Sequence, residues 1–107
     1  MSRMLDDEEF EQLCYWCEGQ ELSSIWAWIS NRSATFKEKK TEFISALRRL
    51  VFEGKIQILD RKNRKPLQGT LDEQVEEFAA SFPTDEHEMN DGIWFYGESC
   101  PGGALWK

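Results

Sequence analysis

The sequence predicts a single α+β domain spanning residues 1–107, with about four helices and a small antiparallel sheet of about three strands. A chain of 107 residues with 40% hydrophobic content is long enough to bury one core. Apolar residues recur every three or four positions across residues 36–51 and 71–82, which predicts helices. Short runs of β-branched and aromatic residues at 55–59 and 93–96 predict strands.

Two short helices are expected before residue 32. Asp6 or Asp7 can cap the first helix, because a carboxylate there accepts backbone amides of the opening turn. Gly19 ends this helix. The second helix starts at Ser23 or Ser24 and includes Trp26, Trp28 and Ile29. Residues 25–29 also alternate like a strand, and the serine start favours the helix. The buried face of the first helix holds Phe10, Leu13, Cys14 and Cys17.

The longest helix follows, and it organises the rest of the chain. Thr35 and Glu38 have the spacing of a capping box at its start. Gly54 can take the left-handed conformation that ends a helix, and residues 55–59 then suit a strand. The buried stripe of the helix consists of Phe36, Phe43, Ile44, Leu47, Leu50 and Val51, opposite Lys37, Thr41, Ser45, Arg48 and Arg49.

The last third is expected to contain one helix and a hairpin. Residues 61–66 form a charged turn, and Thr70 with Glu73 marks a second capping box for a helix that ends at Pro83. Residues 84–92 are polar and acidic, which predicts a loop or one irregular turn. Residues 93–96 then form a strand that pairs with 104–106 across the turn at 99–103.

Charge is strongly segregated along the chain. The net charge is −7, yet residues 32–65 hold eleven Lys or Arg against four acids, a net +7, so the remainder carries −14. Such a molecule repels nucleic acid as a whole, while its acidic surface steers a basic partner towards it. Both regions are also typical of ordinary solvated surface.

The chain is expected to be cytoplasmic and not to associate with a membrane. No run of about 18 apolar residues is present, and the N-terminus is acidic where a signal peptide is basic and then apolar. Three cysteines in such a chain favour free thiols over a disulfide framework.

No residue pattern indicates catalysis, a cofactor or a small-molecule substrate, so the protein is expected not to be an enzyme. The single histidine, His87, lies in an acidic loop without a nucleophile elbow. Cys14 and Cys17 with Cys100 and His87 form the one conceivable zinc set, but the second close pair of ligands is missing. Small core residues explain Cys14 and Cys17 more simply, although a thiol or zinc protein stays as a third hypothesis.

The order helix, helix, long helix, strand and basic loop resembles a winged-helix domain over the first two thirds of the chain. In that case the protein regulates transcription, with the third helix in the major groove. The acidity of the remaining chain argues against an encounter with a polyanion. The nucleic-acid contacts would be Lys37, Lys40, Arg48, Arg49, Arg61, Lys62, Arg64 and Lys65.

The stretches LVFEGKIQI, TLDEQVEEFAASFP and DGIWFYGESCPGGALW resemble a family of small acidic bacterial proteins that is known only as a domain of unknown function. The resemblance extends from EEFEQL to Trp106. Members of this kind are similar to the immunity proteins of polymorphic or contact-dependent toxin systems. The points of resemblance are Gly54, Pro83, Gly92, Trp94, Phe95, Cys100, Pro101, Gly102 and Trp106.

This resemblance implies a binding protein that neutralises a cognate toxin, such as a nuclease, by occluding its basic cleft. The acidic balance is compatible with that role, because carboxylates can stand in for substrate phosphates. A mobile, solvated connection is the alternative interpretation of the acidic loop. The expected contact residues are Asp85, Glu86, Glu88 and Asp91 in the loop and Glu98 in the hairpin turn.

Overall fold

The structure is a computed structural model, and it describes residues 5–32, 35–60 and 62–107. Its elements are α1 (Asp7–Cys17), α2 (Leu22–Ser30), α3 (Phe36–Phe52), β1 (Ile56–Asp60), α4 (Leu71–Ser81), α5 (Glu86–Met89), the 3-10 helix η1 (Asn90–Tyr96) and β2 (Gly102–Trp106). The α+β class is confirmed, but these residues form five α-helices and a 3-10 helix where about four helices were expected, because residues 86–96 are helical. Within these ranges, no helix is both long and apolar enough to cross a membrane.

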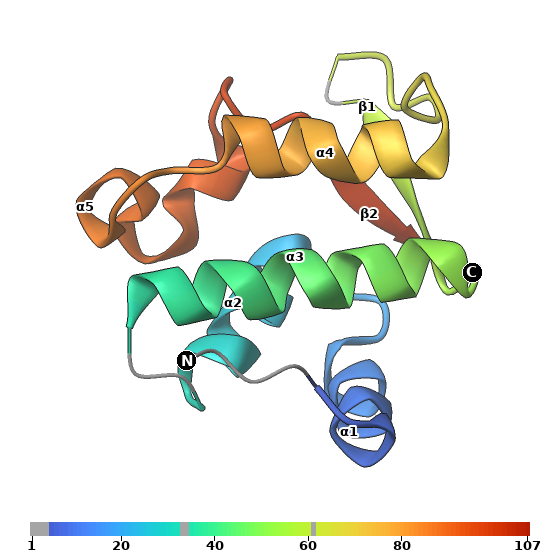
Figure 1. Cartoon of the computed structure of the whole chain (residues 1–107). Coiled ribbons are helices and arrows are strands. Elements are labelled where there is room, and N and C mark those ends of the chain that lie inside the picture. Colours follow the sequence, from blue (N-terminus) through green and yellow to red (C-terminus); the bar gives the residue numbers. More distant parts are fainter. Residues whose placement is uncertain (1–4, 33–34, 61) are drawn as a thin grey trace.

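Helix α3 is the centre of the fold. It packs against α2, α4 and β1, and Figure 1 shows it running across the molecule with α4 alongside, α2 behind it and α1 below. Phe43, Leu47 and Leu50 on its inner face are completely or almost completely buried. This apolar stripe was predicted from the spacing of three and four residues, and the burial confirms it.

Three of the expected helix starts are confirmed. Asp6 and Glu9 form a capping box at α1, in which each carboxylate accepts the backbone amide of the other residue. At α4 the hydroxyl of Thr70 accepts the amide of Glu73, and the carboxylate of Glu73 accepts the amide of Thr70. The amide of Thr70 holds the pKa of the Glu73 carboxyl below its ordinary value. At α3 the hydroxyl of Thr35 accepts the amide of Glu38, which is one of the two hydrogen bonds of the expected capping box. Local hydrogen bonding therefore determines where three helices begin.

Residues 22–30 form a helix, as expected, but it does not start at Ser23 or Ser24. Both serines lie inside the first turn, and the N-cap is Glu21, whose side chain makes no capping hydrogen bond. Its buried residues follow the helical spacing of three and four and not the alternation of a strand. They are Leu22, Ile25, Trp26 and Ile29.

The strand expected at 93–96 is wrong, because these residues belong to η1. Their burial has a period of about three: Gly92 and Phe95 are buried, whereas Ile93 and Tyr96 are exposed. Asn90 and Asp91 have positive φ angles of 50° and 53°, and Gly92 follows at 93°, so the chain is left-handed over the first three residues of η1. Asn, Asp and Gly tolerate this conformation best, which makes the turn possible here.

The sheet consequently has two strands and not about three. Strand β1 pairs antiparallel with β2, and Ile56 lies opposite Trp106 while Asp60 lies opposite Gly102. Residues 104–106 are thus a strand as expected, but their partner is β1. The hairpin that a wing requires after β1 is reduced to a bridge between Leu59 and Pro66, and α4 follows it.

Gly102→Ala should reduce the free energy of unfolding by about 1–3 kcal/mol, measured by urea denaturation. A Cβ atom at this position would overlap the carbonyl oxygen of Leu59, so the paired strands would have to separate.

Gly103→Ala is the matched control. Its Cβ would meet nothing closer than a side-chain oxygen of Glu21 at 3.9 Å, and we expect a change within about 0.5 kcal/mol. Equal losses for the two variants would contradict the close packing of β1 on β2.

Candidate functional site

The segment from residue 84 to 96 is an ordered cap and not an extended loop. Asp85 accepts the amide of Glu88 at 2.8 Å and so caps α5. Met89 and Phe95 anchor the segment in the core, with 2% and 5% of their surface exposed. We call residues 85–96 the acidic cap. Its backbone is held by buried side chains, which leaves its charged side chains at the surface.

The structure brings together four of the five acids that were expected to bind a partner. Asp85, Glu86, Glu88 and Asp91 are all exposed on the acidic cap, whereas Glu98 borders a separate cavity of about 540 Å³ beside Asp60 and Lys62. Three of the four already have local roles. Asp85 caps α5, Glu86 pairs with Lys39 of α3 at 2.8 Å, and Glu88 accepts the hydroxyl of Thr84.

Two large apolar side chains accompany these acids. Ile93 and Tyr96 have 59% and 57% of their surface exposed, and they lie one helical turn apart on η1. The Tyr96 hydroxyl shares a hydrogen bond of 2.8 Å with the Ser23 hydroxyl, which fixes the ring against the start of α2. Exposed aromatic residues that are held rigidly are typical of binding surfaces. The sequence analysis missed both residues because it placed them in a strand.

The basic residues expected to bind nucleic acid are not collected on one face. Lys37, Lys40 and Arg48 border a groove of about 550 Å³ between α3 and α4, which includes Ile44 and Ala79. Arg48 is also paired with Asp72 of α4. These three residues are therefore part of a partly apolar groove, and whether they bind nucleic acid stays a prediction.

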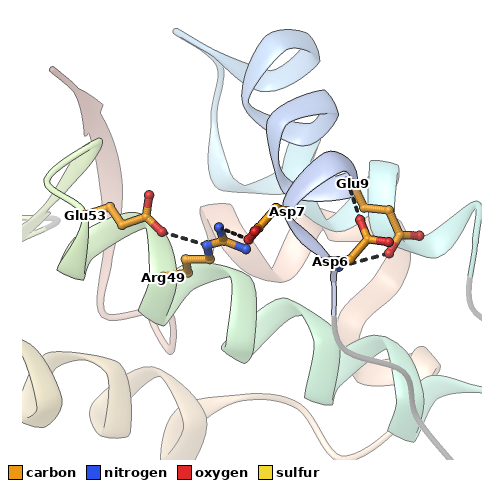
Figure 2. A network of polar contacts seen from close by, with 5 residues as sticks. All are labelled: Asp6, Asp7, Glu9, Arg49 and Glu53. Atoms are coloured by element: carbon orange, nitrogen blue, oxygen red, sulfur yellow. Dashed lines mark hydrogen bonds and ion pairs between the residues drawn. The ribbon is translucent and has the colours of Figure 1, made fainter.

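Arg49 joins α1 to α3, as Figure 2 shows. It pairs with Asp7 at 2.7 Å and with Glu53 at 2.6 Å, and its guanidinium lies 4.0 Å from the centroid of the Phe10 ring. Its contacts are therefore structural. The remaining expected residues follow β1: Lys62, Arg64 and Lys65 are exposed in the turn, and Arg61 lies outside the described residues.

The cysteines are separate thiols. Cys17 and Cys100 are buried and Cys14 is half-buried. Burial raises the pKa of the Cys17 thiol to about 11 and also raises the pKa of Cys14. In the described part of the chain, no three His, Cys, Asp or Glu side chains are grouped to hold a metal ion. His87 is exposed on α5, apart from the cysteines in sequence.

The described residues form an α+β domain, and its candidate functional sites are exposed surfaces such as the acidic cap. Residues 51–107 match the family described as "Protein of unknown function, DUF596", and the chain belongs to this family. No curated protein matches the chain. The expected bacterial domain of unknown function is therefore confirmed, and neither this family description nor the structural match names an immunity protein.

The fold is similar to a solved structure, that of an uncharacterized protein conserved in bacteria from Neisseria meningitidis. The TM-score is 0.79 at 24% sequence identity, and the match covers 92% of this chain and 79% of the other. At this identity the similarity shows the fold alone.

A thiol-specific disulfide reagent should modify Cys14 first at pH 8, with Cys17 and Cys100 reacting only after unfolding in urea. The reagent needs an accessible thiolate, and burial disfavours the thiolate of Cys17. Cys14→Ser should remove the fast phase. Rapid reaction of two thiols in the folded protein would contradict the burial of Cys17.

Cys17 should also make stability depend on pH. Its pKa rises from 9.0 in the unfolded chain to about 11 in the fold, so its contribution is complete below pH 9 and is lost as the pH rises towards 11. Urea denaturation at pH 8 and pH 10.5 should show a smaller loss of stability in Cys17→Ala than in the unmodified protein. An equal loss would assign the pH dependence to other groups.

Proposed function

We propose that the protein is a non-enzymatic binding protein of the cytoplasm, an immunity protein that neutralises a cognate bacterial toxin by direct occlusion. One observation carries the proposal: the acidic cap holds exposed carboxylates and two exposed apolar side chains on a backbone fixed by Met89 and Phe95. A surface that is already ordered loses little conformational entropy on binding. That property favours tight inhibition over transient contact.

The partner of this surface would be a basic protein, such as a nuclease with a cationic cleft. The carboxylates of Glu88 and Asp91 would occupy positions that substrate phosphates otherwise take, and long-range attraction by the net charge of −7 would speed encounter. Ile93 and Tyr96 would then be desolvated at the centre of the contact. Charge would thus control association, and apolar burial would control dissociation.

The first test is co-purification of the tagged protein with the product of the open reading frame immediately upstream, followed by size-exclusion chromatography with light scattering. A stable one-to-one complex that lacks the toxin activity of the free partner is the expected result. A complex that leaves the partner fully active would overturn occlusion.

Glu88→Gln with Asp91→Asn should slow association with that partner by about three- to tenfold at low salt, measured by stopped-flow or surface plasmon resonance. These two positions avoid the cap residue Asp85, and Asn tolerates the positive φ of Asp91. The difference from the unmodified protein should shrink as salt is added.

Glu76→Gln with Glu77→Gln on α4 is the matched control, since it removes the same charge from another exposed site. It should change the association rate less than the variant of the acidic cap. Ile93→Ser should instead raise the dissociation rate. An association rate that neither charge variant alters would remove the acidic cap from the interface.

A further inference from the structure

Helix α1 exposes two large aromatic side chains that the core does not use. Tyr15 and Trp16 have 77% and 64% of their surface exposed. Their rings contact each other edge to face, with centroids 5.3 Å apart and planes at 88°. Rings of this size usually bury most of their area, so an adjacent exposed pair is typical of a contact surface.

The attachment of α1 to the rest of the protein does not involve this pair. Phe10, Leu13 and Cys17 on the inner face of α1 are buried in the core. The N-terminal end is fixed by the ion pair between Asp7 and Arg49, shown in Figure 2, and Glu9 pairs with Arg32 at 2.6 Å. None of these contacts involves Tyr15 or Trp16 on the outer face of α1.

The outer face of α1 is also acidic. Residues 5–21 contain seven Asp or Glu and no Lys, Arg or His. Glu8 and Glu11 lie seven and four residues before Tyr15, and Glu18 lies three residues after it. This spacing places the three acids on the same side of the helix as Tyr15. Within the described part of the chain, none of these three forms an ion pair, unlike Asp7 and Glu9.

The edge of this face is less acidic. A shallow cavity of about 280 Å³ separates α1 from the end of the sheet, and Glu11, Glu18 and Tyr15 share it with Lys55 and Lys107. The two lysines come from the ends of β1 and β2. They confine the purely acidic part of the surface to α1 itself.

We propose that Tyr15 and Trp16, together with Glu8, Glu11 and Glu18, form a docking surface for an arginine-bearing segment of a partner protein. A guanidinium group stacks on an aromatic face and can bind a carboxylate through two parallel hydrogen bonds. The surface offers both an aromatic face and a carboxylate to the guanidinium, because Glu11 and Glu18 each lie within about one helical turn of Tyr15. The carboxylates around the rings form no ion pair in the described part of the chain, and together they outnumber the two neighbouring lysines, which favours a cationic segment over an apolar one.

This surface is independent of the acidic cap. It is formed by α1, whereas the cap is formed by α5 and η1, and Figure 1 shows α1 and α5 on separate parts of the molecule. The inference can therefore fail or succeed without the immunity proposal. A partner that uses both surfaces would contact two separate regions of the domain.

The test is a titration of the isotope-labelled protein with a six-arginine peptide and, separately, a six-lysine peptide, followed by NMR. We expect the arginine peptide to shift the side-chain indole signal of Trp16 most among the five tryptophans and to bind at least about threefold more tightly than the lysine peptide. Signals from α4, which is also acidic, should move less.

Two double variants separate stacking from charge. Tyr15→Ser with Trp16→Ser should weaken arginine-peptide binding by about three- to tenfold and abolish the preference over lysine. Glu11→Gln with Glu18→Gln should weaken both peptides. Circular dichroism checks that each variant folds, and Glu76→Gln with Glu77→Gln is the control for removal of two exposed charges.

Three outcomes would overturn the proposal. The first is equal weakening by the α4 control, which would mean that the peptide follows net charge alone. The second is unchanged binding in the aromatic variant. The third is a free protein that is dimeric by light scattering and becomes monomeric in the aromatic variant, because a second copy would then cover the surface.

Discussion

The aromatic ring of Phe82 contacts rings from three other helices, and the arrangement of the domain depends on this packing. The ring lies at the end of α4 and contacts Trp26 of α2 at 5.3 Å, Phe43 of α3 at 5.5 Å and Trp94 of η1 at 5.1 Å, measured between centroids. Each aromatic pair adds about 0.5–1.5 kcal/mol beyond the area it buries. Because four helices meet at this cluster, the acidic cap is fixed by the core and not by its own charges.

The parts of the fold that could be predicted from the sequence depend on local contacts, and the part that could not depends on this aromatic cluster. The starts of α1, α3 and α4 depend on hydrogen bonds between residues three apart, so Thr35, Thr70 and the pair Asp6 or Asp7 identified them. Residues 93–96 have the composition of a strand, yet the position of Trp94 and Phe95 depends on rings distant in sequence. β-Propensity reflects how well a side chain packs on a half-buried sheet. Here Trp94 and Phe95 pack in the aromatic cluster and not on a sheet, so their β-propensity did not predict a strand correctly.

Composition and spacing identified acids but not their local contacts. Asp7 was expected only as a possible helix cap, and it instead pairs with Arg49. Glu9 and Glu42 were not singled out, although Arg32 lies between them in a partly buried network. Glu42 is only 2% exposed, on a helix whose polar side was expected to be wet. Trp16 was missed for a related reason: a tryptophan in a small domain is usually part of the core, and only the packing shows which one is not.

The division between paired and unpaired carboxylates connects the charge of the protein with its binding surfaces. An exposed ion pair contributes at most about 1 kcal/mol, so the fold gains little from acids such as Glu86. Unpaired acids contribute even less to the fold, and their mutual repulsion opposes the compact state. Yet Glu8, Glu11 and Glu18 surround an exposed aromatic pair, and Asp91 lies two residues before the exposed Ile93. Stability alone does not account for carboxylates beside exposed apolar groups, and their position supports the cationic partner proposed for each of the two surfaces separately.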